Sequence, residues 1–381
     1  MDRTPSRTTI PGPLLFLFVV LIGLSLITSG DAAPNRPSQK KKFFVVSSYH
    51  REYNWSKETN DGFCDAMLRL KYFDNKEQIA EYTRNDYVET SRAVIKKMWM
   101  DSKRRKSSQE KAAATAQITK SIKEFNPDIL LLGDDEAAEF VGGRHLDDKL
   151  PAVFWGLNHN PAKYGLVDRP DRPGHNVTGV YQSGYHAESA HLLKSIVPGI
   201  KSFAILSDET PSGRSNLKAV EYITRQGNFP FKLVESVATN DSDTWKSKAL
   251  ELQQKVDAFY VAQYSGLKDR DGNPVPDLET AAWYVSHIKI PEFAGNKFRV
   301  EEGMLCAADD SGYNQAYEAV GIAHDILANG ARPATYPTRA PKRGKLVANR
   351  ERARILGIRL TEDMDIEEFV ENILPRDGGK R

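Results

Sequence analysis

Short apolar runs alternate with segments of helical periodicity along most of this chain, and this order restricts the folds that it can adopt. The clearest runs are FFVVSSY at 43–49, ILLL at 129–132 and LPAVFWGLN at 150–158. Each has the length and the β-branched or aromatic content of a strand, whereas the segments between them have helical spacing of apolar residues. Continuous apolar strands that alternate with helices are typical of a parallel sheet covered on both faces. We therefore predict an α/β fold.

The alternation occurs twice, on either side of a loop-like segment. Residues 159–176, HNPAKYGLVDRPDRPGHN, are rich in Pro, Gly, Asp and Asn, which favours a boundary between two halves. We expect lobe 1 to comprise 43–158 with about 308–330, and lobe 2 to comprise 177–305 with about 336–360. The predicted fold class is therefore α/β, with two Rossmann-like lobes that contain parallel sheets and are joined by a hinge.

Lobe 2 is expected to begin with the strand VTGVY at 177–181. A helix at about 313–329 should stop at Gly330, because glycine is a common residue directly after a helix. The segment 345–358 is interpreted as strand-like, and 361–381 as a polar tail.

The N-terminus has the order of charge, apolar core and small residues that is typical of a secretory signal peptide. Arg3 and Arg7 precede an apolar run at 13–28. We interpret 1–33 as a Sec-type signal peptide and 34–42 as a linker, and expect a periplasmic or extracellular protein. The apolar run is shorter than the roughly 20 residues of a membrane span, but an uncleaved N-terminal membrane anchor stays an alternative.

Composition and charge restrict the class of protein. The content of 40% apolar and 27% charged residues is that of a globular protein, and the net charge of +2 creates no overall field toward nucleic acid. The most basic stretch, SKRRKSSQEK at 102–111, also contains Ser, Gln and Glu and is interpreted as a solvated turn and helix start. We therefore expect no nucleic-acid partner.

The sequence motifs of common cofactors and enzymes are absent. No GxGxxG follows a predicted strand, and neither the phosphate loop GxxxxGK(S/T) nor the nucleophile motif GxSxG occurs. His186 and His191 lack the spacing of a helical zinc pair. We therefore predict no cofactor, no metal site and no catalytic residues.

The chain contains two cysteines, Cys64 and Cys306. In an exported protein they could form one disulfide, and their distance in sequence neither supports nor excludes this pairing. Apolar neighbours in GFCDAM and MLCAA favour the alternative of two buried free thiols.

Polar or aromatic residues end several predicted strands in both halves. In open parallel α/β sheets, ligands bind outside the carboxyl ends of the strands. The residues at these ends are Ser48, Tyr49, Asp134, Asp135, Asn158, Asp208, Gln263, Tyr264 and Asp309. A cleft between two lobes would gather them around a small solute, so we interpret them as candidate ligand-binding residues.

The acidic stretch after the strand at 129–132 has two interpretations. Asp134, Asp135 and Glu136 could cap a helix, because acids at a helix N-terminus interact favourably with its dipole. Asp134 or Asp135 could also contact a cationic ligand group such as an ammonium. The two roles can coexist, whereas a catalytic acid–base pair is the less favoured alternative.

Two aromatic residues and one serine complete the candidate site. Tyr49 and Trp55 could stack on a flat ligand, although packing of a helix onto the sheet is an equal alternative for Trp55. Ser48 could bind a carboxylate together with backbone N–H groups, or could simply cap a helix.

Several stretches, in the same order, resemble the ABC-transporter substrate-binding proteins of the tryptophan/tyrosine-type group. The segment 151–180 resembles the family's crossover between lobes, KVDAFYVAQY at 255–264 resembles a later cleft strand, and 337–358 resembles its Asn-containing C-terminal signature. SSYHREYNWSKETNDGF at 47–63, together with MDSKR and DILLLGDDEAAEF, resembles a branch also found as extracytoplasmic sensor domains. The resemblance covers roughly 43–360.

The resemblance implies a type I periplasmic-binding-protein fold. It also implies a monomeric exported protein that captures a small molecule, such as an amino acid-like solute, in the cleft and delivers it to an ABC permease in the membrane. Asn158 and Gln263 or Tyr264 depart from acids that are common at the corresponding positions of relatives. The alternatives are a ligand-presenting subunit of a membrane sensor and a carboxylate-based enzyme that uses residues 134–136.

Overall fold

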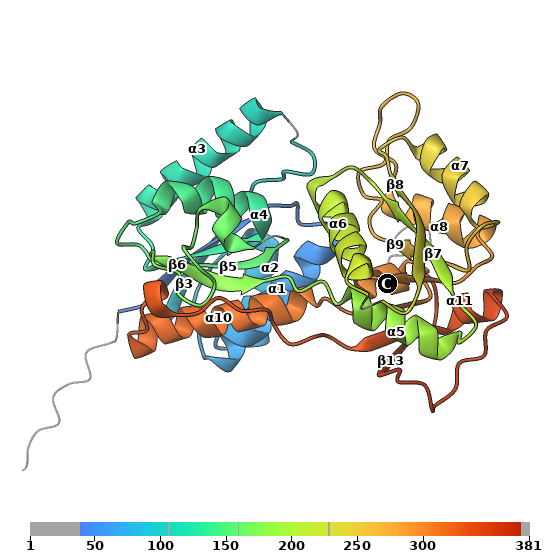
Figure 1. Cartoon of the computed structure of the whole chain (residues 1–381). Helices are drawn as coiled ribbons and strands as arrows, with labels where there is room; N and C mark the ends of the chain where they lie inside the picture. The colour runs from blue at the N-terminus through green and yellow to red at the C-terminus, as the bar shows by residue number, and fades with distance from the viewer. Residues whose placement is uncertain (1–38, 106, 159, 228, 375–381) are drawn as a thin grey trace, which may run out of the picture. The chain divides into compact units, whose positions relative to one another are not determined.

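The computed structural model describes residues 39–105, 107–158, 160–227 and 229–374 (Figure 1). The predicted signal peptide, most of the predicted linker and the last part of the predicted tail lie outside the described residues. Within these ranges, no helix combines the length and apolar character that a membrane crossing requires.

The first sheet has six strands in the order β2-β3-β1-β4-β5-β6. All neighbouring strands run parallel except β2 and β3, which are antiparallel. The strands are β1 (Lys41–Ser47), β2 (Tyr87–Glu89), β3 (Ala93–Trp99), β4 (Ile129–Gly133), β5 (Ala152–Leu157) and β6 (Val177–Tyr181).

The second sheet has seven strands in the order β13-β12-β11-β10-β9-β7-β8. Only β11 and β12 are antiparallel neighbours among these strands. The strands are β7 (Ser202–Ser207), β8 (Lys232–Ala238), β9 (Ala258–Val261), β10 (Glu292–Ala294), β11 (Cys306–Ala308), β12 (Leu346–Asn349) and β13 (Glu368–Val370). The two mostly parallel sheets with their helices confirm the predicted fold class.

Helices connect the strands of both sheets. In the first half they are α1 (Asn54–Arg69), α2 (Lys76–Asn85), α3 (Ser108–Phe125) and α4 (Asp134–Glu136), which continues as a π-helical turn (Ala137–Val141) and a 3₁₀ turn (Gly142–His145). In the second half they are α5 (His186–Ile196), α6 (Pro211–Arg225), α7 (Ser242–Leu252), α8 (Asp277–His287), α9 (Lys297–Glu301), α10 (Gly312–Asn329) and α11 (Arg350–Ile355). Short 3₁₀ turns lie at Pro161–Tyr164 and Pro333–Thr335.

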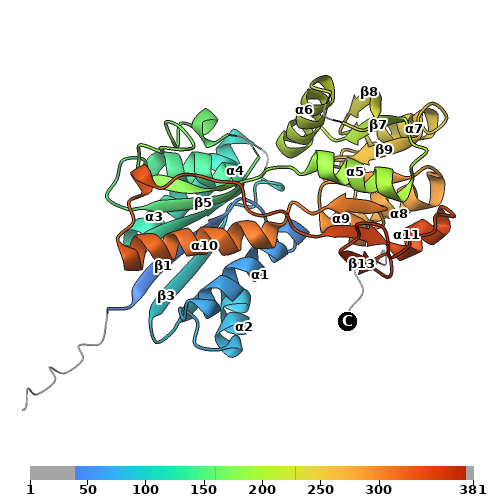
Figure 2. The ribbon, with the colours of Figure 1, turned by 60° about the horizontal axis from the view of Figure 1, so that its bottom comes forward.

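Helix α10 lies between β11 and β12 of the second sheet in the sequence but packs on α1 against the first sheet (Figure 2). An added methyl group at Gly62 of α1 would collide with the backbone carbonyl of Tyr313, so glycine permits the close approach of the two helices. The helix ends where the sequence predicted, because Gly330 adopts the left-handed conformation with φ +71°.

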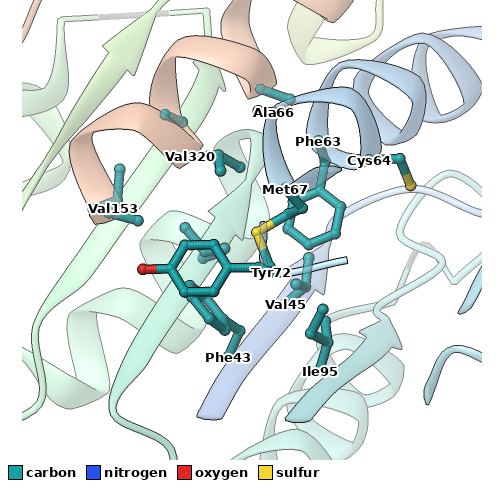
Figure 3. Packing of buried hydrophobic residues seen from close by; sticks show 14 of the residues in the cluster. Phe43, Val45, Phe63, Cys64, Ala66, Met67, Tyr72, Ile95, Val153 and Val320 are labelled. Atoms are coloured by element: carbon teal, nitrogen blue, oxygen red, sulfur yellow. The ribbon is translucent and has the colours of Figure 1, made fainter. Parts of the chain in front are cut away.

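The core explains why β1 is apolar on both faces. Phe43 and Val45 pack with Phe63 and Met67 of α1 (Figure 3). The alternate residues of β1 lie in a separate cluster that includes Ile118 of α3. A strand covered by helices on both faces therefore has no polar position along its centre.

The two cysteines lie in different clusters. Cys64 packs in the core between α1 and the first sheet, and Cys306 packs in a core of the second sheet. Both are buried free thiols, which confirms the second of the two alternatives.

Two boundary predictions were wrong. Residues 177–181 do not begin lobe 2, because β6 pairs with β5 in the register Ala152↔Val177 and extends the first sheet. The later residue Arg339, also expected in lobe 2, forms a bridge with Val180 of β6. The segment 151–180 therefore adds β6 to the first sheet before the chain enters the second sheet at β7.

The segment 345–358 is strand only in its first part. Strand β12 ends at Asn349, whose side chain accepts a hydrogen bond from the backbone N–H of Arg352 at 2.9 Å and caps α11. This cap starts a helix where a longer strand was expected.

Candidate ligand-binding site

Two adjoining cavities lie at the carboxyl ends of strands from both sheets, and we call them together the cleft. The larger cavity has a volume of about 490 Å³ and its lining includes Tyr49, Lys103, Asp135, Asn158, Tyr164, Ser212 and Ser265. The smaller has a volume of about 30 Å³ and its lining includes Tyr49, Tyr53, Trp55, Asn158, Gln182, Gln263, Asn296 and Phe298. Four of the predicted residues therefore line the smaller cavity, and Asp135 lines the larger one.

Ser48 is fully buried and caps a helix that does not follow its own strand. Its hydroxyl accepts a hydrogen bond from the backbone N–H of Ala137 and donates one to the carbonyl of Gly133, both at 2.8 Å. It thereby holds the turn between β4 and α4 against the end of β1. Ser48 lines neither cavity, so the structure supports the capping alternative.

Asp134 lies beneath the cleft and fixes one of its aromatic walls. The carboxylate accepts a hydrogen bond from Trp55 Nε1 at 2.6 Å, and the residue has a positive φ of 70°. Burial raises the pKa of Asp134 well above its usual range, against the smaller opposing effect of the Trp55 hydrogen bond. Asp134 therefore positions Trp55 rather than lining the cavity.

Asp135 lines the larger cavity, and its carboxylate is engaged on both oxygens. It accepts hydrogen bonds from the backbone N–H of Asn158 at 3.0 Å, from Asn158 Nδ2 at 2.5 Å and from the Tyr164 hydroxyl at 2.6 Å. These contacts join the loops after β4 and β5. The neighbouring acid, Glu136, pairs with Lys111 at 3.4 Å.

Asp208 organises the loops of the second sheet around the cleft. It is fully buried and accepts hydrogen bonds from the Thr210 hydroxyl at 2.5 Å and from the backbone N–H of Gly266 at 2.7 Å. Thr210 and Gly266 line the larger cavity, whereas Asp208 does not. The structure thus gives Asp208 a supporting position.

Gln263 and Tyr264 belong to a buried ionic network centred on Arg299. Arg299 is 1% exposed, and its guanidinium donates to Glu302 at 2.5 Å, to Asp277 at 3.0 Å and to the side-chain oxygen of Gln263. The network holds the side-chain oxygen of Gln263, a residue that lines the smaller cavity.

Tyr264 is held inside the same network. Its hydroxyl donates to Glu302, and its ring lies 3.8 Å from the guanidinium of Arg299. Tyr264 is buried and lines neither part of the cleft, so it supports Arg299 from beneath.

Asp309 does not join the other predicted residues. It lines a separate cavity of about 810 Å³ together with Glu58 and Lys297, and accepts a hydrogen bond from the backbone N–H of Lys297 at 2.8 Å. Burial raises the pKa of Asp309 to about 6. Asp309 directly follows β11, and the chain then enters α10 at Gly312.

Several cleft residues were missed from the sequence. Tyr53, Phe298 and Lys103 carry aromatic and cationic groups, and Asn216 and Asn296 add amides. Lys103 lies in the MDSKR stretch, whose resemblance to the sensor-domain branch did not predict a binding residue. No pattern of spacing marks Phe298, which follows β10 on the short helix α9.

Metal binding finds no support in the described part of the chain. No group of three or more His, Cys, Asp or Glu side chains is arranged there to hold a metal ion. The cleft instead offers aromatic faces, amides, hydroxyls, lysines and carboxylates, a set suited to an organic solute.

Solved structures of binding proteins share this fold. An ABC domain from Streptococcus pneumonia in complex with L-Trp superposes with a TM-score of 0.63 and 18% identity, over 87% of this chain and 100% of that one. An adhesive substrate-binding protein from Clostridium difficile gives 0.63 and 18%, over 87% and 99%. An arabinose-binding protein from Geobacillus stearothermophilus gives 0.51 and 12%, over 84% and 100%.

Sequence comparison identifies the family. No curated protein matches the chain. The profile of the family described as ABC transporter substrate binding protein matches residues 93–369, which run from the start of β3 into β13 and so include most strands of both sheets. The chain therefore belongs to the ABC transporter substrate-binding protein family.

Proposed function

We propose that this protein captures a small organic solute in the cleft and delivers it to an ABC permease. The observation that carries the proposal is the composition of the cleft lining, which comes from strand ends of both sheets. Tyr49 and Asn158 follow strands of the first sheet, and Gln263 follows a strand of the second. A solute that contacts both sets would stabilise the arrangement in which they converge.

The permease partner is inferred from the family. The solute-bound form would present a surface to the membrane protein that the unliganded form lacks. The pneumococcal relative has been solved with L-Trp, and we propose a solute of comparable size, such as an amino acid-like molecule, for this chain. The exported, monomeric state that the sequence predicts is part of the same proposal.

The acids at 134–136 support binding rather than acid–base catalysis. Asp134 is bonded to Trp55, Asp135 to Asn158 and Tyr164, and Glu136 pairs with Lys111. Each carboxylate is thus committed to positioning a neighbour. We propose that no covalent chemistry takes place in the cleft.

A thermal-shift screen of the mature protein tests the proposal. Amino acids, nucleobases, sugars and organic cations would be added separately, and a solute at about 100 times its Kd should add roughly 2.7 kcal/mol of stability. The shift should be reduced in Gln263→Leu and Asn158→Leu and preserved in Gln226→Leu, which changes an exposed amide at the end of α6.

Solution binding alone does not establish delivery. The solute-loaded protein should stimulate ATP hydrolysis by its reconstituted permease more than the unloaded protein does. If no solute shifts the melting temperature of the folded protein, the proposed capture is wrong.

A further inference from the structure

Lys103 places its ammonium group on two aromatic faces inside the cleft. Its loop is fixed beside the end of β1 by backbone hydrogen bonds, including Ser102 N–H to the carbonyl of Ser48 at 2.9 Å. The Lys103 ammonium lies 4.5 Å from the centre of the Tyr49 ring and 4.4 Å from that of Tyr53. Both distances are within the range of a cation–π interaction.

Within the described residues, no carboxylate pairs with this ammonium. Nearby cations do have such partners, since Arg104 pairs with Glu52 at 2.9 Å and Lys111 pairs with Glu136 at 3.4 Å. The Lys103 ammonium therefore relies on the ring faces, which are a weaker and replaceable partner.

The surroundings of these rings favour positive charge. Burial by itself would lower the pKa of Lys103, but Tyr53 and the carboxylates of Asp208 and Asp277 outweigh it, and the pKa is raised. Burial, followed by the negative charge of Asp134, raises the pKa of Tyr49 as well. The raised pKa of Lys103 thus reports a negative potential at this wall, whereas the raised pKa of Tyr49 reflects mainly its burial.

The charged side chains of the larger cavity agree with this result. Four carboxyl side chains face three lysines, of which Lys103 is one. The carboxyl side chains belong to Asp135, Glu136, Glu139 and Glu209, and the other lysines are Lys111 and Lys268. When Lys103 leaves the cavity, the excess of acidic groups increases.

Tyr49 adds a polar group without a partner. The residue is 6% exposed, lines both cavities, and its hydroxyl has no hydrogen bond to any described residue. A hydroxyl without a protein partner is available to a ligand that occupies the space beside it.

We propose that the faces of Tyr49 and Tyr53 form a subsite for an organic ammonium group of the solute, and that Lys103 occupies this subsite until the solute displaces it. The proposal rests on the solute-binding function proposed above. It restricts the solute to amines and quaternary ammonium compounds, because their positive charge can replace that of Lys103 on the faces of Tyr49 and Tyr53.

The test measures binding of choline and putrescine by titration calorimetry, with succinate as an anionic probe. Lys103→Met removes the charge and keeps most of the side-chain length. If Lys103 occupies the subsite about nine-tenths of the time, its removal should tighten cation binding about tenfold. Arg105→Met removes a charge from an exposed residue of the same loop and should leave the affinity unchanged.

The ring faces are tested separately. The Tyr53 changes are made in the Lys103→Met variant. Tyr53→Leu removes one ring face and should weaken cation binding at least about tenfold, whereas Tyr53→Phe keeps the ring face and should retain binding. Comparison of the two substitutions distinguishes the contribution of the Tyr53 ring to cation binding from that of its hydroxyl.

Four results would overturn the proposal. Binding of succinate that Lys103→Met abolishes would make Lys103 a contact for an anion. Cation binding that neither Lys103→Met nor Tyr53→Leu changes would place the cation elsewhere. If only uncharged solutes bind, the ammonium subsite is wrong while solute capture stands, and if no solute of any class binds, both proposals fail.

Discussion

The two sheets contribute different chemistry to the cleft. The first sheet supplies aromatic faces and Lys103, whose ammonium has no carboxylate partner among the described residues. The second supplies Gln263, whose orientation is fixed by the buried guanidinium of Arg299. The first wall can therefore exchange its cation for another, whereas the second wall is held by ion pairs between Arg299 and two carboxylates. This difference predicts that removal of Arg299 lowers stability strongly, whereas removal of Lys103 lowers it little.

The largest effect is expected from Arg299→Met. The change leaves Glu302 and Asp277 without their cation in a buried position, which should lower the free energy of unfolding by about 3–5 kcal/mol. Urea denaturation followed by circular dichroism measures it. Arg270→Met breaks an exposed pair with Asp243 and should cost no more than about 1 kcal/mol. Equal losses in the two variants would contradict the proposed support of the second wall.

The second largest effect is a pH dependence of stability that arises from two buried acids, Asp309 and Asp310. Burial raises the pKa of Asp310 to about 7, and that of Asp309 to about 6, both above the unfolded value of roughly 3.9. The folded state thus binds protons that the unfolded state does not, so stability should rise as the pH falls from about 7 toward 4. We expect a gain on the order of 1–3 kcal/mol between pH 7 and pH 5.

The pH effect is checked by denaturation at several pH values. Asp310→Asn keeps the shape of the side chain and should remove the larger part of the dependence in this window. Stability that falls from pH 7 to pH 5 in the native sequence would show that the buried acids do not govern it.

Trp55→Phe should have a somewhat smaller effect. It removes the N–H that binds Asp134 and leaves a buried carboxyl oxygen without its donor, at a cost of about 1–3 kcal/mol. The double variant with Asp134→Leu should cost less than the sum of the two single changes, because the pair is removed together. Strict additivity would indicate that the contact does not position Trp55.

The smallest effect is expected from Lys103→Met. A cation that is held by ring faces and by no carboxylate can be removed at a cost of about 1 kcal/mol in the free energy of unfolding. A loss as large as that of Arg299→Met would mean that the first wall depends on its lysine for stability, and the comparison between the two walls would fail.

Local patterns were sufficient for most helices and strands. The apolar runs of β4 and β5 and the C-terminal glycine of α10 depend on residues that are neighbours in sequence, so their positions were predicted closely. The partner of β6 was not, because strand pairing depends on residues distant in sequence, and in the structure β6 pairs with β5.

The candidate site divides in the same way. The sequence indicated that polar groups end the strands, and the parallel arrangement requires that they meet at one edge. It did not indicate which of these groups would form hydrogen bonds within the protein and not line the cleft, namely Ser48, Asp134, Asp208 and Tyr264. It also did not indicate that Asp309 would line another cavity. Side-chain direction and partner depend on elements that are distant in sequence.

What the sequence by itself determined is the order of strands and helices, the α/β class and the family, since each depends on periodicity or on ordered local stretches. Only the tertiary structure decided which polar groups line the cavity. Tyr49 and Gln263 both line the cavity, but only the side-chain oxygen of Gln263 is held in place, by Arg299, which is distant in sequence. A hydrogen bond is satisfied in space, and the residues that satisfy it can be separated by most of the chain.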